Sequence, residues 1–154
     1  DAAFASAGIV PCVTHGRTDH SPVFRYAYGD AIQTLQQAPI SPDGLRRVRY
    51  VNPLNGQNAL ALLDSSMVQL DADRPSLPMK TNANLVVAVV EGQGESQVGE
   101  KTLQWQKRDV FTVPQHNWVR HRAIGGEARF FVVSDADVLR RLNLLTEEIN
   151  SAQG

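Results

Sequence analysis

The stretch from Leu85 to Arg122 constrains the fold of this chain more than any other part of the sequence. It reads LVVAVVEGQGESQVGEKTLQWQKRDVFTVPQHNWVRHR: an apolar strand runs into a Gly-x-Gly turn, a second turn follows at Gly99, and an Arg-Asp turn leads into a β-rich run ending at Pro114. Short strands separated by turns at this spacing predict a sandwich, jelly roll or small barrel. The layout is that of a metal-binding β-barrel motif, but other residues replace the histidines that flank such a motif.

Composition narrows the class of protein and its surroundings. A length of 154 residues predicts one domain, large enough to bury a core without disulfides or a structural metal. The net charge of −1 argues against nucleic acid or an anionic membrane as a partner. Because Cys12 is the single cysteine, an intrachain disulfide is excluded, and a reducing compartment, the cytoplasm, is expected. With no apolar run long enough to span a bilayer and no basic leader, neither a membrane span nor a signal peptide is expected.

The sequence divides into three segments: residues 1–45 as an N-terminal arm with a short helix, residues 46–134 as the β-barrel, and residues 135–154 as a C-terminal helix and tail. The short helix is predicted over about Asp30–Gln37, where Asp30 caps the first amides and a proline follows the end. The closing helix is predicted because apolar residues recur at helical spacing behind a Ser-Asp cap, namely Val138, Leu142 and Leu145. The predicted fold class is therefore all-β, with a helix before and after the barrel.

Two further local predictions concern turns and an aromatic segment. Gln93-Gly94 is predicted to open a hairpin after the apolar strand. FRYAYG is predicted to be extended, with Phe24, Tyr26 and Tyr28 on one face, where they cover the barrel edge or contact another domain or subunit.

Five segments carry a resemblance to a known family. They occur in the same order and spacing as in the C-terminal half of gentisate 1,2-dioxygenases and their salicylate- and hydroxynaphthoate-cleaving relatives, and together they span nearly the whole chain. The segments are FRYAYGD (Phe24–Asp30), VRYVNPLNG (Val48–Gly56), VVEGQGESQVG (Val89–Gly99), WQKRDVFTVP (Trp105–Pro114) and VVSDADVLRRLNL (Val132–Leu144). The resemblance implies a cupin jelly-roll barrel, the second of two cupins in such a protein.

Several expectations follow from this resemblance alone. Family members hold Fe(II) with three histidines of the N-terminal cupin and use oxygen to open an aromatic ring that bears a carboxylate beside a hydroxyl. The N-terminal cupin of the same protein is then an expected partner, a homo-oligomer (a tetramer) the expected assembly, and an aromatic hydroxy acid the expected substrate.

The cupin ligand positions predict no metal and no cofactor in this chain itself. Counted back from Gly92, the glutamate position is Leu85, and the two histidine positions fall within residues 78–81, which read Pro-Met-Lys-Thr. The histidine position after Pro114 is Val119. Iron in oxygenases takes imidazole and carboxylate ligands, which none of these residues supplies.

Few other residues are candidates for chemistry. His116 and His121 are weak metal candidates, and their odd separation puts them on opposite faces of a regular strand. His15 and His20 share that odd separation. Arg47 and Arg49 project from one face of a strand and suit an aromatic carboxylate through charge-assisted hydrogen bonds, although two exposed edge-strand arginines explain the pattern equally well. No catalytic residue is predicted.

Three functions remain open at this point. The first is the metal-free C-terminal cupin half of a gentisate-type dioxygenase, with a scaffold and subunit-contact role. The second is a stand-alone metal-free cupin that binds a small molecule for sensing or transport. The third is a metal-independent isomerase or epimerase that uses His116 or His121 as its base.

Overall fold

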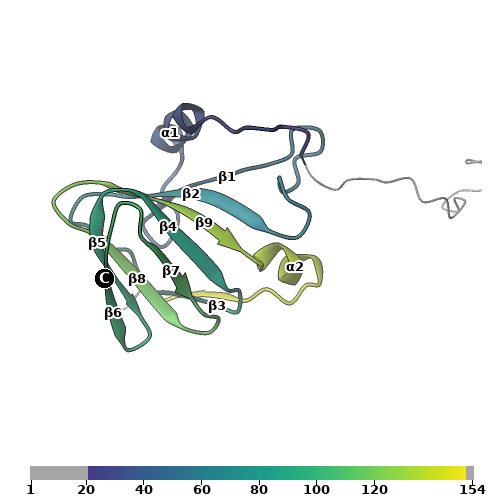
Figure 1. Ribbon diagram of the computed structural model, residues 1–154. Helices are drawn as coiled ribbons and strands as arrows, with labels where there is room; N and C mark the ends of the chain where they lie inside the picture. Colours follow the sequence, from purple (N-terminus) through teal and green to yellow (C-terminus); the bar gives the residue numbers. More distant parts are fainter. Residues whose placement is uncertain (1–20, 152–154) are drawn as a thin grey trace, which may run out of the picture.

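The computed structural model describes residues 21–151, and in it two five-stranded antiparallel sheets face each other as a jelly roll (Figure 1). The first sheet has the order β1 (Arg46–Arg49), β2 (Asp64–Leu70), β9 (Ala128–Ser134), β4 (Leu85–Glu91) and β7 (Val110–Val113). The second has the order β10 (Glu147–Ile149), β3 (Met79–Thr81), β8 (Trp118–Ala123), β5 (Gln93–Val98) and β6 (Lys101–Gln106). The predicted all-β jelly roll is confirmed.

The core lies between the sheets because their strands alternate inward apolar residues with outward ones. Phe130 of β9 stands at its centre, 1% exposed, and Trp105 of β6 meets it edge-on with the ring centroids 4.8 Å apart. Trp105 is thus a core residue, whereas Trp118 lies at the surface with the Lys80 ammonium 4.9 Å from its ring centroid. The buried cluster around them consists of Leu45, Val68, Leu70, Val87, Val89, Val98, Val113, Val119, Ala123 and Ala128.

The chain crosses from the first sheet to the second at Gly92, between β4 and β5. The predicted hairpin at Gln93-Gly94 is therefore wrong, because β4 pairs with β7 and β9 whereas β5 pairs with β6 and β8. Gly92 has φ +86°, and a Cβ there would lie 2.6 Å from the Glu127 carbonyl oxygen, so the corner requires glycine. The real hairpin joins β5 to β6 across Gly99.

The N-terminal helix α1 (Tyr28–Gln37) begins two residues earlier than predicted. Ala27 occupies the N-cap without a side-chain hydrogen bond, so Asp30 lies in the first turn and does not cap the helix. The extended FRYAYG prediction is also wrong at its end, since Tyr28 is already helical. Tyr26 packs edge-on against Tyr50, and its hydroxyl donates to the Val51 carbonyl. The first twenty residues, with His15, His20 and Cys12, lie outside the described residues.

The C-terminal segment differs most from its predicted helix. Helix α2 covers only Ala136–Arg141 and ends before Asn143, whose φ of +56° is incompatible with further helix. The chain then returns as β10, which pairs antiparallel with β3 and forms the edge of the second sheet. The helical sequence pattern does not predict this strand. Asn82 fixes this return, because its side chain accepts from the Thr146 amide and donates to the Leu144 carbonyl. Within residues 21–151, no helix is both long and apolar enough to cross a membrane.

Candidate binding cavity between the sheets

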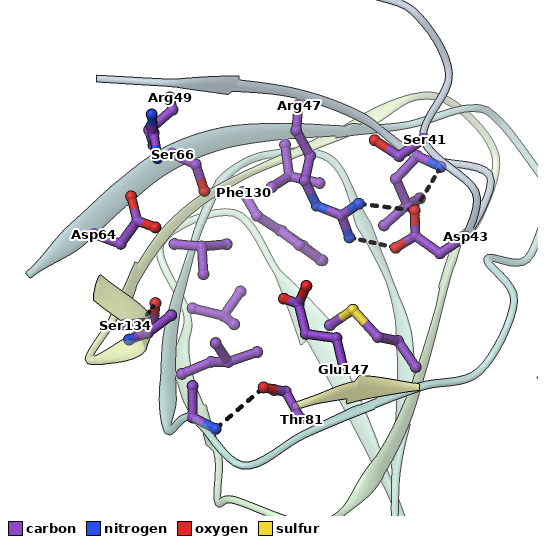
Figure 2. Close-up of a pocket in the computed structure, with 18 of the residues that line it drawn as sticks. Ser41, Asp43, Arg47, Arg49, Asp64, Ser66, Thr81, Phe130, Ser134 and Glu147 are labelled. Carbon is purple, nitrogen blue, oxygen red and sulfur yellow. Dashed lines mark hydrogen bonds and ion pairs between the residues drawn. The ribbon is translucent and has the colours of Figure 1, made fainter. Parts of the chain in front are cut away.

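A cavity of about 470 Å³ lies between the two sheets, within the size range of small-molecule sites (Figure 2). Strands β1, β2, β9 and β4 form one wall, and β3, β8 and β10 form the other. Because the strands are paired in register, the inward side chains of the first wall form cross-strand rows. From one end to the other, the rows are Arg47–Val68–Phe130–Val89, then Arg49–Ser66–Val132–Val87, then Asp64–Ser134–Leu85.

The positions expected to hold a metal in this fold lie at this cavity but carry no metal ligands. Met79, Thr81 and Leu85 line it, and Val119 is the register partner of Met79 across the β3–β8 pair. Lys80, between them, instead pairs with Glu148 at 3.0 Å. Three apolar side chains and one hydroxyl do not fit Fe(II), which takes imidazole and carboxylate ligands. Within the described part of the chain, no three His, Cys, Asp or Glu residues are grouped to hold a metal ion.

The two weak histidine candidates are separated, but not for the predicted reason. The prediction assumed that His116 and His121 share a regular strand. His116 instead lies in the turn before β8, with φ +63°, and its amide donates to the Thr81 carbonyl at 2.7 Å. His121 lies on β8 and lines the cavity. The structure therefore does not bring these two histidines together at one site.

His121 belongs to a hydrogen-bonded chain of three side chains. Its Nδ1 lies 2.6 Å from Ser96 Oγ, and the Trp105 indole donates to the same oxygen at 2.8 Å. The register places His121 directly across from Ser96, which is 0% exposed. Since the indole nitrogen is only a donor, the Ser96 oxygen accepts from Trp105. The direction of the Ser96–His121 hydrogen bond depends on which imidazole nitrogen carries the proton.

The surroundings of His121 keep it neutral. Its pKa is lowered from 6.5 to about 4, mainly by burial and secondly by the positive charge of Arg47, while the negative charge of Asp43 opposes the shift. The neutral imidazole is the form that can accept a proton, and His121 lines the cavity, so its use as a base stays a prediction.

Arg47 and Arg49 both line the cavity, but only Arg47 has an acidic partner among residues 21–151. Arg47 directs two nitrogens at the carboxylate of Asp43, with Nη1 to Oδ1 at 2.7 Å and a short contact between Nη2 and Oδ2. Asp43 is 2% exposed and lies at the same end of the cavity (Figure 2). This bidentate pair uses the guanidinium fork of Arg47, so its charge is already compensated.

Arg49 has no hydrogen-bond or ion-pair partner among residues 21–151; it is exposed to solvent and lies in the middle row, across from Ser66. Asp64, two residues before Ser66 on the same inward face, accepts from Arg140 through Oδ2 at 3.2 Å. Its second oxygen, Oδ1, is buried and meets no donor within that part of the chain. Sequence reasoning singled out neither Asp43 nor Asp64: Asp43 meets Arg47 through a turn just before β1, and Asp64 meets Arg140 only because β2 pairs with β9.

Comparison with known proteins places these observations in a family. No protein-family model matches the chain. It is 32% identical to a gentisate 1,2-dioxygenase of Haloferax sp over 90% of its own length and 39% of that protein. It is 29% identical to gentisate 1,2 dioxygenase 1 of Aquipseudomonas alcaligenes (84% of this chain, 38% of that protein) and 28% identical to a 5-aminosalicylate 1,2-dioxygenase of Comamonas sp (86% and 37%). The chain thus spans less than half the length of these relatives.

Solved structures agree on the fold. The salicylate 1,2-dioxygenase of Pseudoaminobacter salicylatoxidans superposes with a TM-score of 0.80 at 22% identity, over 97% of this chain and 44% of that one. A cupin 2 conserved barrel domain protein of Rhodopseudomonas palustris matches with a TM-score of 0.52 at 20% identity, over 60% of this chain and 61% of that one. The resemblance is confirmed: the chain is a cupin half homologous to part of the longer gentisate-type 1,2-dioxygenases.

Proposed function

We propose that this chain is the C-terminal, metal-free cupin half of a gentisate-type Fe(II) ring-cleaving dioxygenase, in which it serves as scaffold and subunit contact. The observation that carries the proposal is the replacement of the metal ligands inside an otherwise intact cupin. Met79, Thr81, Leu85 and Val119 occupy the ligand positions, so no step of the ring cleavage is assigned to this half. The substrate of the whole protein would be an aromatic hydroxy acid.

The iron of the whole protein would be held by three histidines of the N-terminal cupin, where it binds substrate and oxygen together. This half would support that cupin as a scaffold and take no part in the reaction. Its segment between β1 and β2 supports such a role, because four leucines there are exposed to solvent: Leu54, Leu60, Leu62 and Leu63. Grouped apolar side chains of this kind mark contact surfaces. We assign them to contacts with the N-terminal cupin or with another subunit of a tetramer in the cytoplasm.

Iron content and oxygen uptake test the proposal together. The full-length protein is loaded anaerobically with Fe(II), desalted and analysed for iron, and oxygen uptake is then followed with gentisate, salicylate and 1-hydroxy-2-naphthoate. We expect about one iron per full-length chain, background iron in the 154-residue chain, and uptake with at least one acid. No uptake with any of the three would reject the dioxygenase assignment.

The same measurement on the short chain has its own decisive outcome. About one iron per 154-residue chain would show that this half is not metal-free. His121→Gln and His116→Gln, each analysed in the same way, would then identify the histidine that holds the iron.

A second function is favoured by a different observation. The cavity of about 470 Å³ combines an apolar wall with Arg49, which has no partner among residues 21–151, so it suits a small molecule. This alternative applies to the chain as a stand-alone metal-free cupin for sensing or transport. Of the two arginines proposed to bind a substrate, Arg49 is the better placed, because Arg47 is already paired with Asp43. A bound organic molecule in the purified chain, seen by mass spectrometry after denaturation, would support it, and its absence together with no binding of added acids would reject it.

A further inference from the structure

We propose that the outward face of the second sheet binds a small tetrahedral dianion, either free phosphate or the phosphate group of a small phosphate monoester. Arg120 and Arg122 of β8 would bind its oxygens, Arg74 would add a third positive charge at the rim, and the Thr102 hydroxyl would donate a hydrogen bond. The site faces away from the cavity between the sheets, so the proposal is independent of both functions considered above.

Strand alternation places the two arginines of β8 on the outward face. Val119 and Ala123 of the same strand belong to the core, at 2% and 0% exposure, so Arg120 and Arg122 point the other way. On one side of β8 lie β5 and β6 (Figure 1). On the other side, residues 73–76 are hydrogen-bonded along β8. The two arginines therefore stand between polar neighbours on both sides.

The sheet register brings polar side chains from three strands to one hollow. Gln97 of β5 lies across from Arg120, Glu95 lies across from Arg122, and Thr102 of β6 is the register partner of Gln97. These side chains line a hollow of about 260 Å³. Two guanidinium groups, an amide and a hydroxyl thus open into the same small space.

Arg120 is the residue that points to an anion. Its side chain is half-buried and has no hydrogen-bond or ion-pair partner within residues 21–151. Nε is covered by the protein, whereas the terminal nitrogens are not, so a ligand would reach the guanidinium through these two atoms. A partly buried charge without a counterion costs free energy, which a bound anion would lower.

The acidic groups nearby do not neutralise the three arginines. Among the described residues that line the hollow, Glu95 is the one carboxylate, and its Oε2 accepts from a glutamine amide of β6 at 3.2 Å. Asp43 lines an adjoining hollow of about 410 Å³ together with Arg74 and Arg120, but its carboxylate is held by Arg47. The arginines therefore exceed the free acids by the two charges that a phosphate dianion carries.

The size and the lining of the hollow favour a small inorganic group over an aromatic ring. Small-molecule sites usually measure about 300–1,000 Å³, and this hollow lies below that range. Its neutral side chains, Gln97 and Thr102, are polar. Arginine binds phosphate through paired, charge-assisted hydrogen bonds, and a dianion can engage both guanidinium groups with a full charge for each.

Calorimetric titration of the 154-residue chain, at constant ionic strength and about pH 8, where phosphate is mostly the dianion, tests the proposal with phosphate, glycerol 3-phosphate and acetate as probes. We expect phosphate to bind with a Kd of about 1 mM or below, and acetate roughly tenfold more weakly. Arg120→Gln should weaken phosphate binding roughly tenfold or more, since charge-assisted hydrogen bonds are lost. Glu95→Gln should strengthen it roughly threefold, because a neighbouring negative charge is removed.

Arg25→Gln is the matched control. Arg25 is exposed, carries the same charge and lines neither hollow, so its replacement should leave the affinity unchanged. Glycerol 3-phosphate identifies the source of the phosphate group, since tighter binding than phosphate indicates a phosphate monoester and weaker binding indicates the free ion.

Four outcomes would overturn the proposal. The first is no phosphate binding, at ten times the expected Kd, to a chain that circular dichroism shows to be folded. The second is equal affinity for acetate and phosphate, and the third is an equal loss in Arg25→Gln, which would reveal only an effect of net charge. The fourth is unchanged affinity in both Arg120→Gln and Glu95→Gln. Iron-free full-length protein takes the same titrations where the isolated chain does not fold, and oxygen uptake by the iron-loaded protein reports separately on the dioxygenase assignment.

Discussion

Replacing Ser96 with alanine should destabilise the fold far more than the loss of one hydroxyl suggests. Ser96 is 0% exposed and its Oγ holds both Trp105 Nε1 and His121 Nδ1, at 2.8 and 2.6 Å. Alanine leaves each of these polar atoms without its partner inside the protein. An unsatisfied buried polar atom costs about 1–3 kcal/mol, so the two together give roughly 2–6 kcal/mol.

The two atoms should not contribute equally. Trp105 is 4% exposed and packed against Phe130, so water hardly reaches its indole N–H to replace the lost acceptor. His121 lines the cavity, where solvent can reach part of its ring. We therefore expect a loss in the lower half of the range, about 3 kcal/mol, out of the roughly 5–15 kcal/mol that stabilises a typical domain.

Urea unfolding at pH 7 measures the effect. With an m-value of about 1–3 kcal/mol/M, the midpoint should fall by roughly 1–3 M while m stays constant. Thr102→Ala on the neighbouring strand β6, where the residue is exposed, is the control and should stay within about 0.5 kcal/mol. Trp105→Phe combined with Ser96→Ala should cost less than the two single changes summed, because the orphaned donor is gone. A loss below about 0.5 kcal/mol for Ser96→Ala would refute the network.

Three further predictions concern pH, packing and charge. The pKa of His121 is about 4 in the fold against 6.5 in an unfolded chain, so between these values the unfolded state binds a proton that the folded state does not. The free energy of unfolding is therefore full above pH 6.5 and falls by about 3 kcal/mol as the pH drops to 4. His121→Gln should lose this pH dependence in acid unfolding curves, and an unchanged curve would contradict the assignment. Gly94→Ala should unfold the domain or cost several kcal/mol, because its Cβ would lie 2.1 Å from a backbone carbonyl oxygen and 2.6 Å from an indole ring, whereas Gly126→Ala, with nothing within 4 Å, should cost less than about 1 kcal/mol in thermal melts. Arg47→Met should destabilise more than Asp43→Asn, since the Asp43 side chain is 3% exposed and the Arg47 side chain 32%, so the stranded carboxylate cannot reach water; the reverse order in urea midpoints would show that the pair is not buried as described.

The strand pattern predicted the fold class because burial on one face leaves a period-two signal in each strand. The apolar run Leu85–Val90, the Gly99 turn and the Gly125 turn all lie where this signal and the turn residues indicate. Which strands pair is a different question. A run that ends in Gly92-Gln93-Gly94 looks the same whether the chain folds back as a hairpin or crosses to the opposite sheet, since the choice depends on which later strands pair with β4 and with β5.

The C-terminal segment shows the same limit from the helical side. Apolar residues at Val138, Leu142 and Leu145 predict a helix of several turns, yet only Ala136–Arg141 is helical. Leu142 and Leu144 stay exposed, and the chain leaves the helix to complete the second sheet beside β3. The decisive contacts come from Asn82, more than sixty residues away, and a local pattern carries no information about them.

The two arginines on β1 show the same limit of sequence patterns at the cavity. Alternation on β1 was enough to predict that Arg47 and Arg49 share a face, but two arginines on one face are equivalent until their partners are known. Asp43, which precedes the strand and is buried, compensates the first. Strand β2 places Ser66 across from the second, which has no acidic partner within residues 21–151. The difference between the two arginines therefore comes from a local contact: Asp43 lies four residues before Arg47, in a turn that the strand alternation does not describe.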